Sequence, residues 1–264
     1  MPESWIAFNQ RWGSPQGSRL LRASWRSRGL STVLNVVAFK PFPGSRGMFG
    51  FQDNNETRRT EYPWAFFATD LKPGMCAVDV GGSLSGFQFV LAKSGLKVIN
   101  VDPGMEAHGK GWPVDQASIA RLNRAFGTSV QLENCFLEKA NIAPRSVDRV
   151  FSISTIEHIP EGEITSLMRR VYEILKPGGK FVATVDLFLN VEPFCRRASN
   201  EYGVNISVAA LCGAAPFKLV HGDPQELCGF KEFSTDRVLS RLETYCYGTY
   251  PALVQTVVLE KPAA

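Results

Sequence analysis

A regular alternation of apolar strands and helices between residues 74 and 186 constrains the fold of this chain more than any other feature. Five short apolar runs predict β-strands, at residues 75–80, 97–101, 129–135, 148–154 and 180–186. The segments between them predict helices, at residues 86–96, 115–127 and 161–179. Apolar strands that alternate with helices are typical of a parallel sheet covered on both faces. The sequence therefore predicts an α/β fold whose parallel strands all end at one ligand-binding edge.

The rest of the chain is less regular. Residues 187–233 mix aromatic residues, arginine, glycine and proline, which favours an elaborated loop or a small cap. Beyond them, we expect a helix at residues 234–242 with Ser234 or Thr235 as its N-cap. Two strands should follow, at residues 242–250 and 252–261. We divide the chain into an N-terminal segment (residues 1–73) and a core (residues 74–264). The core contains an insertion at residues 187–233.

Composition excludes several classes of protein. The chain has 264 residues, and no apolar run approaches the roughly 18 residues that a membrane span requires. The first ten residues lack a basic stretch followed by an apolar one, so we expect a soluble, cytoplasmic protein and no secretion. The six cysteines contain no C-x-x-C pair, and there are only three histidines. We therefore expect reduced thiols and no bound metal.

Positive charge is concentrated at the N-terminus. Residues 1–60 contain nine arginines and lysines against three acidic residues. Such a segment is compatible with a transit peptide, a nucleic-acid-binding arm, a lid over an anionic ligand or a solvated helix. The aromatic, glycine and proline content of residues 38–52 favours an ordered segment that packs on the core. We therefore interpret residues 1–73 as a lid over a substrate.

The stretch VDVGGSLSGF, at residues 78–87, predicts a strand that runs through a glycine turn into a helix. Asp102 ends the next strand, 23 positions after Asp79 and close to the spacing of about 20 in dinucleotide sites. The loop lacks the third glycine of G-x-G-x-x-G, so an NAD site fits poorly. Tyr172 and Lys176 match the Y-x-x-x-K of short-chain dehydrogenases, but the glycine loop of those enzymes is missing, and we treat the match as chance.

Four motifs in order resemble those of the class I S-adenosylmethionine-dependent methyltransferases. They are VDVGGSLSG, VINVDPG, SVDRVFSISTIEHIP and LKPGGKFVATVD, which together cover about residues 74–186. The resemblance implies a Rossmann-like fold with a seven-stranded, mostly parallel sheet, helices on both faces and a C-terminal antiparallel hairpin. It also implies S-adenosyl-L-methionine as the cofactor.

The resemblance assigns cofactor contacts to the ends of the first four strands and the loops that follow them. The residues expected there are Asp79, Gly81, Gly82, Ser83, Gly86, Asp102, Pro103, Cys135, Phe136 and Ser154. Arg59 and Tyr62 are also expected to bind the cofactor, because an arginine just before the first strand, Arg58 or Arg59, can bind its carboxylate and an aromatic side chain there can close over the site. Ser83 and Ser85 stand where the family often has glycine. The family often has an acid near the adenine amino group, whereas here Asn134, Cys135 or Phe136 must serve.

A general base is needed only if the methyl acceptor is a hydroxyl, a phenol or a protonated amine. His158 is the first candidate, because it follows the fourth strand at the ligand edge and has an ordinary pKa near 6.5. Asp186, at the end of the fifth strand, and His221 are weaker candidates. The alternative is that Glu157 and His158 are structural and cap the next helix.

Acceptor recognition is expected from the segments outside the core. Arg196, Arg197, Asn200, Tyr202 and Asn205 suit an acidic or oxygen-rich small molecule. We therefore predict methyl transfer to a small-molecule acceptor, with O-methylation of a metabolite or sugar as the leading reaction. The alternatives are N- or S-methylation, an RNA methyltransferase, and a cofactor-binding protein without activity. We expect no membrane or nucleic-acid partner, and the sequence leaves a homodimer open.

Overall fold

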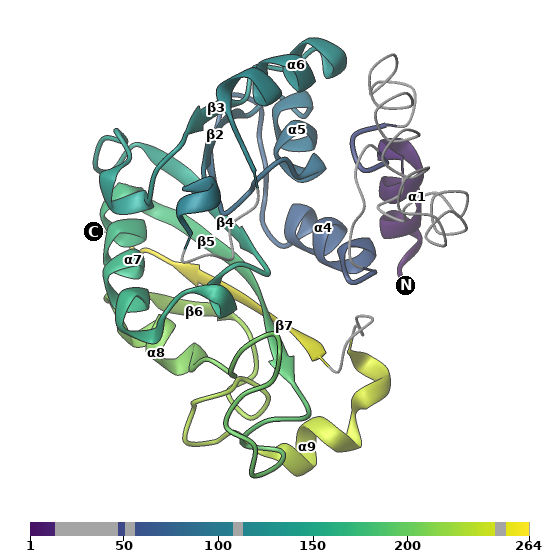
Figure 1. Ribbon diagram of the computed structural model, residues 1–264, viewed down its shortest axis with the longest axis vertical. Coiled ribbons are helices and arrows are strands. Elements are labelled where there is room, and N and C mark those ends of the chain that lie inside the picture. The colour runs from purple at the N-terminus through teal and green to yellow at the C-terminus, as the bar shows by residue number, and fades with distance from the viewer. Residues whose placement is uncertain (14–46, 51–55, 108–112, 246–251, 264) are drawn as a thin grey trace.

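The computed structural model describes residues 1–13, 47–50, 56–107, 113–245 and 252–263. A seven-stranded sheet forms its centre, with the strand order β3-β2-β1-β4-β5-β7-β6 (Figure 1). The strands are β1 (Cys76–Val80), β2 (Lys97–Val101), β3 (Gln131–Glu133), β4 (Val147–Ile153), β5 (Leu175–Phe188), β6 (Lys218–His221) and β7 (Ala252–Glu260). Strands β1 to β5 pair in parallel, and β7 pairs antiparallel with both β5 and β6. The expected α/β fold with a mostly parallel seven-stranded sheet is confirmed.

Helices cover both faces of this sheet. The helices are α1 (Glu3–Trp12), α4 (Arg58–Phe67), α5 (Gly86–Lys93), α6 (Gln116–Phe126), α7 (Glu161–Ile174), α8 (Val208–Gly213) and α9 (Thr235–Ser240). Alternate residues of each strand enter two separate apolar cores. Val78, Val150 and Ala183 pack with α7 and α8, whereas Ala77 and Val182 pack with α1, α4, α5 and α6.

The expected antiparallel strand pair near the C-terminus is confirmed, but its first strand lies elsewhere in the sequence than predicted. Its first strand is β6, which lies inside the predicted insertion at 187–233. The prediction of a strand at 242–250 is wrong for the residues that the structure describes, because Leu242–Thr244 is a 3₁₀ helix. Residues 246–251 lie outside the described residues. Side-chain bonds explain the difference. The Tyr245 hydroxyl donates to Glu226 over 2.6 Å, and Arg241 also bonds Glu226, which ties this segment to a loop instead of the sheet edge.

Helix boundaries follow local capping chemistry. The Ser234 hydroxyl accepts the N–H of Arg237 at the start of α9, which confirms Ser234 as the N-cap. Helix α7 ends at Ile174, five residues earlier than expected, because Leu175 already pairs with Val147 in the sheet. The Lys-Pro-Gly-Gly segment therefore belongs to the start of β5 and does not end the helix.

The N-terminal segment packs against the core through its described parts. Phe8 of α1 contacts Phe49 and Phe66, with ring centroids 5.7 and 4.9 Å apart. A side chain at Gly86 would meet the Met48 carbonyl group, so the glycine at the start of α5 permits this close approach. Most of the basic residues of the predicted lid fall at 14–46, outside the described residues.

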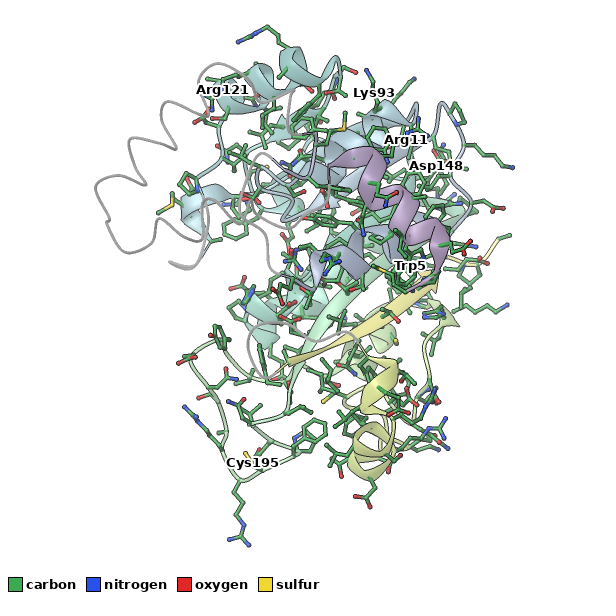
Figure 2. The ribbon with its side chains drawn as sticks, turned by 90° about the vertical axis from the view of Figure 1, so that its right-hand side faces the viewer. Trp5, Arg11, Lys93, Arg121, Asp148 and Cys195 are labelled. Atoms are coloured by element: carbon green, nitrogen blue, oxygen red, sulfur yellow. The ribbon has the colours of Figure 1, made fainter. Side chains whose placement is uncertain are left out.

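The segment that follows β5 projects from the molecule. Cys195 lies at the end of the molecule opposite α6, the helix that carries Arg121 (Figure 2). Two side chains of the predicted acceptor cluster bond their own loop: Asn200 donates to Asn190, and Asn205 donates to the Phe188 carbonyl. Within the described ranges, no helix has the length and apolar character that crossing a membrane requires.

Candidate functional site

The site lies where the strand order reverses, between β1 and β4. From β1 the chain continues outward to β2 and β3, and β4 begins the other half of the sheet on the opposite side. In open α/β sheets, ligands bind at the carboxyl ends of the strands at such a reversal. A side chain at Gly81, in the loop after β1, would lie 2.7 Å from the Thr155 hydroxyl, in the loop after β4. The two loops are therefore in contact at the reversal point.

The backbone of Ser83 fixes the glycine loop. Ser83 has a φ of +45°, a left-handed conformation that is uncommon for a residue with a side chain. Its N–H donates to Asp102 Oδ2 over 2.8 Å. Its carbonyl accepts from Asn100 Nδ2 over 2.7 Å and from Gln88 Nε2 over 3.0 Å. Serine is tolerated where the family often has glycine because three hydrogen bonds hold this backbone in place.

Asp102 joins the ends of β1 and β2. Its Oδ2 accepts the N–H of Ser83, and its Oδ1 accepts the N–H of Gly104 over 2.6 Å. The side chain is buried, and burial raises its pKa while the two amides act in the opposite direction. A carboxylate oxygen has more than one lone pair, so each oxygen that accepts an amide can accept a second donor from a ligand. Asn134, in the loop after β3, donates to the Asp102 carbonyl over 2.8 Å.

Asp79 lies directly beneath the glycine loop. A side chain at Gly82 would approach Asp79 Oδ2 to 2.7 Å and Asn100 Oδ1 to 2.8 Å. Glycine is therefore required for the loop to pass over these two groups. Asp79 is 2% exposed, and burial together with the nearby charge of Asp102 raises its pKa to about 7. Asp79 thus supports the loop from below.

A buried ion pair joins α4 to the ends of β4 and β5. Glu61 of α4 accepts hydrogen bonds from the hydroxyls of Ser154 and Thr184, both over 2.6 Å. Arg58, one turn earlier, bonds Glu61 and donates to Ser154 Oγ over 2.8 Å. Burial opposes ionisation of Glu61, but Arg58 and the two hydroxyls hold its pKa below the ordinary value. The N-terminal segment therefore contributes Arg58 to this edge.

Glu157 also lies at this edge, in the short turn Ile156–His158 after β4. It is 3% exposed, and Asp186, near the end of β5, is 2% exposed. Burial and the charges of Asp186 and Glu61 raise the pKa of Glu157 well above its ordinary value. His158, the predicted base, is exposed. The alternative that this pair caps α7 is not supported, because the N-cap position of that helix is Pro160, which makes no side-chain cap hydrogen bond.

The other predicted cofactor residues occupy several environments. Tyr62 is buried between Phe49 and Phe87, with ring centroids 5.0 and 5.4 Å away, and its hydroxyl bonds the side chain of Ser85. It therefore supports the glycine loop from the apolar core. Cys135 and Phe136 are half-buried after β3. Pro103, at the end of β2, is also half-buried, and Gly86 begins α5.

Two of the predicted site residues lie differently from their neighbours at this edge. Arg58 reaches the ends of β4 and β5 through Glu61 and Ser154, whereas the contact of Arg59 that the structure gives is its carbonyl group, which accepts from Asn9. His221 contacts Thr256 over 3.0 Å and Trp64 with ring centroids 5.6 Å apart. His221 pairs with Val258, which pairs with Val182, four residues before Asp186. At about 3.3 Å per residue, this places His221 roughly 13 Å along the strands from Asp186.

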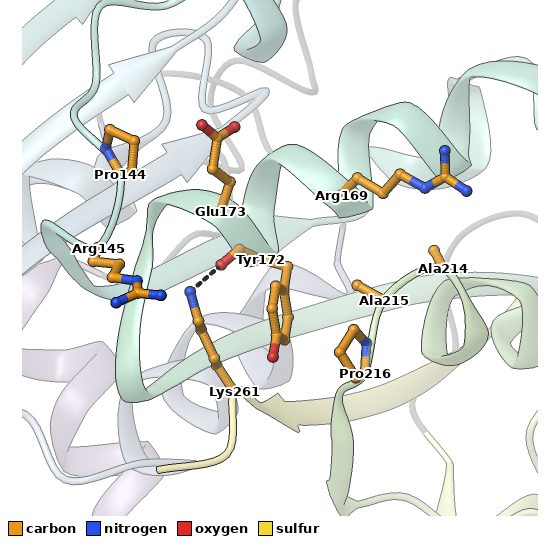
Figure 3. Close-up of a pocket in the computed structure, with 9 residues that line it drawn as sticks. All are labelled: Pro144, Arg145, Arg169, Tyr172, Glu173, Ala214, Ala215, Pro216 and Lys261. Atoms are coloured by element: carbon orange, nitrogen blue, oxygen red, sulfur yellow. Dashed lines mark hydrogen bonds between the residues drawn. The ribbon is translucent and has the colours of Figure 1, made fainter. Parts of the chain in front are cut away.

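A cavity of about 440 Å³ lies elsewhere in the fold. Figure 3 shows Arg145, Tyr172 and Lys261 in its lining, and the Lys261 ammonium donates to the Tyr172 carbonyl over 2.8 Å. Arg145 precedes β4 and Lys261 follows β7, so this cavity is at the amino-terminal edge of the parallel strands. It is therefore separate from the edge that carries the glycine loop.

Sequence comparison shows what the central part of the chain is similar to. The family model described as "Methyltransferase domain" matches residues 78–183. Phosphoethanolamine N-methyltransferase 2 of Caenorhabditis elegans is 30% identical over 118 residues, which are 44% of this chain and 25% of the relative. Phosphoethanolamine N-methyltransferase 3 of Arabidopsis thaliana is 34% identical over 118 residues, 44% of this chain and 22% of the relative. The match spans about a quarter of the length of these curated relatives.

Solved structures agree on the fold. The [4+2]-cyclase SpnF has a TM-score of 0.55 and 13% identity, and the match covers 77% of this chain and 80% of SpnF. The 1,6-didemethyltoxoflavin-N1-methyltransferase of Burkholderia thailandensis, solved with S-adenosylhomocysteine, has a TM-score of 0.52 and 16% identity, with 89% of both chains covered. These likenesses confirm the predicted Rossmann-like fold with its seven-stranded, mostly parallel sheet. Residues 78–183 are similar to the methyltransferase domain family, in agreement with the resemblance found in the sequence.

Proposed function

We propose that this domain binds S-adenosyl-L-methionine at the carboxyl ends of β1 and β2 and transfers its methyl group to a small-molecule acceptor. The observation that carries the proposal is the bond between the glycine loop and Asp102 at the reversal point of the sheet. At Gly82 the backbone passes so close to Asp79 and Asn100 that a side chain would clash with both. The loop and the acid thus provide the close approach and the ribose-binding carboxylate that an adenosine ligand needs.

The chain's own residues supply binding and orientation. Asp102 would accept the ribose hydroxyls, and the backbone of Gly81 and Gly82 would lie against the amino-acid portion of the ligand. Cys135 and Phe136 follow β3 and would border the adenine. The cofactor brings a methyl group already activated on a sulfonium, so the domain contributes positioning, for which near-attack geometry provides on the order of 7–11 kcal/mol.

The acceptor would bind at the ends of β4 and β5. The N-terminal segment reaches this edge through Arg58 and Glu61, which supports its proposed role as a wall over the substrate. For a hydroxyl acceptor, as in O-methylation, a base is required, and His158 is the exposed candidate. For an amine acceptor, a buried carboxylate would serve instead. The two curated relatives are named N-methyltransferases, which supports nitrogen over oxygen.

Isothermal titration calorimetry with S-adenosylhomocysteine tests the proposed cofactor site. The proposal expects saturable binding of one ligand per chain and no binding of NAD. Transfer itself is tested by incubating the protein with methyl-deuterated S-adenosylmethionine and a metabolite extract. Because one fold can host different chemistries, as the cyclase SpnF illustrates, a labelled product distinguishes an active enzyme from a protein that only binds the cofactor.

A further inference from the structure

We propose that the cavity at the amino-terminal edge of the parallel strands binds a small organic phosphate, with Arg145 and Lys261 holding the phosphate group. The inference goes beyond the proposed function, because this edge lies opposite the one that carries the glycine loop. The cavity volume of about 440 Å³ falls in the range of roughly 300–1,000 Å³ that small-molecule sites have. The proposal follows from the charges and hydrogen bonds of the lining.

The backbone at Arg145 is fixed against the C-terminal end of α7. Arg145 has a φ of +53°, a left-handed conformation that is uncommon for a residue with a side chain. Its N–H donates to the Glu173 carbonyl over 3.0 Å, and the N–H of Ser146 donates to the Ile174 carbonyl over 2.9 Å. Main-chain groups therefore satisfy these two helix carbonyls, and the Arg145 guanidinium is not needed for that purpose.

The two arginines of the lining carry unused charge. Among the described residues, neither Arg145 nor Arg169 has a side-chain hydrogen bond or an ion pair. Glu173 is the acidic side chain of the lining, and its Oε2 pairs with Arg170 over 2.8 Å. Residues 14–46 contain no aspartate or glutamate, so they bring no carboxylate side chain that would neutralise this lining. The guanidinium groups are therefore available to an anion, whose oxygens match their N–H groups.

Lys261 brings a second cation to the end of the cavity where Arg145 lies. Figure 3 shows the Arg145 guanidinium beside the Lys261 ammonium. Lys261 is 7% exposed, and its ammonium donates to the carbonyls of Tyr172 and Leu175, both over 2.8 Å. An ammonium has three N–H groups, so one remains for a ligand. Burial and the charge of Arg145 lower the pKa of Lys261, and an anion bound between the two cations would offset their repulsion.

The rest of the lining defines the class of ligand. Tyr172, Ala215 and Pro216 provide an apolar wall beside Lys261 (Figure 3). The Tyr172 ring is held by Phe217, with ring centroids 5.0 Å apart, and by the Lys261 ammonium 4.6 Å from its centroid. A phosphomonoester carries a charge of about −1.5 to −2 at pH 7 and three acceptor oxygens, which suits two adjacent cations better than a carboxylate does. The ligand is therefore a phosphomonoester on a compact apolar or aromatic body.

Calorimetric titration with phenyl phosphate tests the proposal, because this probe combines a phosphomonoester with a small aromatic body. We expect saturable binding of one probe molecule per chain at pH 8 and low ionic strength. Phenol lacks the charge and should not bind, and benzoate should bind at least tenfold more weakly. Absence of phenyl phosphate binding, or equal affinity for either comparison compound, overturns the proposal.

Variants of Arg145 place the probe in this cavity. Arg145→Gln removes the charge and keeps a polar side chain, so the Kd for phenyl phosphate should rise at least tenfold. Arg145→Lys should retain part of the affinity. Arg124→Gln, which removes an exposed arginine of α6, is the matched control and should leave the Kd unchanged. An equal Kd in Arg145→Gln and the wild type, with the fold verified by circular dichroism, contradicts the proposal.

A competition titration separates this site from the cofactor site. The Kd for phenyl phosphate should stay within twofold when S-adenosylhomocysteine is present at saturation, because the two ligands occupy opposite edges of the sheet. Displacement of the probe by S-adenosylhomocysteine overturns the proposal. If S-adenosylhomocysteine itself does not bind while phenyl phosphate binding depends on Arg145, the proposed function fails and this inference stands.

Discussion

Ser83 donates its backbone N–H to Asp102 Oδ2 over 2.8 Å, and this bond joins the loop after β1 to the end of β2. The two residues are 19 positions apart. The bond fixes the carboxylate beside the glycine loop, and it also fixes a loop whose φ of +45° at Ser83 is unfavourable by itself. Cofactor affinity and loop stability should therefore change together when either partner is altered.

Substitution of Gly82 tests how closely the loop passes over Asp79. In Gly82→Ala, the new methyl would lie within 3.0 Å of Asp79 and Asn100, so the loop must move. We expect the free energy of unfolding to fall by about 2 kcal/mol, as in other overpacked sites, and affinity for S-adenosylhomocysteine to fall with it. Gly162→Ala, on α7 with open space around it, is the control. Equal stability of the two variants in urea unfolding would contradict the described packing.

Substitution of Arg58 tests the buried ion pair with Glu61, and substitution of its neighbour Arg59 is the control. Arg58→Ala leaves Glu61 buried without its cation, which should lower the free energy of unfolding by about 3–5 kcal/mol. Arg59→Ala removes a half-buried side chain that makes no ion pair with the described residues, so its effect should stay within about 0.5 kcal/mol. Urea unfolding measures both. A loss in Arg59→Ala as large as that in Arg58→Ala would contradict the assignment of the buried ion pair to Arg58.

Asp79 should make stability depend on pH. Its pKa is 3.8 in the unfolded chain and about 7 in the folded protein. The folded state therefore binds the proton more tightly, and this contribution to stability falls as pH rises from about 4 to 7. Between pH 5 and 8, the loss from this group is roughly 2–3 kcal/mol.

Asp79→Asn removes that dependence and supplies an amide donor beside Asn100 Oδ1, which has no hydrogen-bond partner among the described residues. The variant should therefore gain stability over the wild type at pH 8 and gain less at pH 5. Urea unfolding at the two pH values gives the difference. If wild type and variant lose the same stability between pH 5 and 8, Asp79 does not titrate in that range.

The fold could be predicted largely from local sequence patterns. Apolar runs identified the parallel strands because a strand covered on both faces is apolar throughout. Strand β6 escaped prediction because Lys218–His221 is an edge strand with no fully buried residue, and so it has no apolar signature. The segment at 242–245 contains residues with strong strand propensity, yet side-chain bonds to Glu226 direct it away from the sheet.

The site was predictable where it depends on spacing along the chain. Asp102 and the glycine loop follow from their distance in sequence. Glu61 was missed because its partners Ser154 and Thr184 are 93 and 123 positions away, and their meeting depends on how α4 packs. His158 was chosen as the candidate base by its place after the fourth strand and its ordinary pKa, and Glu157 shares that place. Which of the two neighbours faces inward depends on the direction of the turn after β4, and the sequence carries no signal for it.

The central claim is that the glycine loop and Asp102 bind S-adenosylmethionine, and calorimetric titration of S-adenosylhomocysteine into the wild type and Asp102→Ala tests it most directly. The account predicts saturable binding of one ligand per wild-type chain. In the variant, affinity should fall at least about tenfold, or about 1.4 kcal/mol, because the ribose acceptor and the anchor of the Ser83 amide are both lost. Absence of binding to the wild type, or equal affinity in the two proteins, would contradict it.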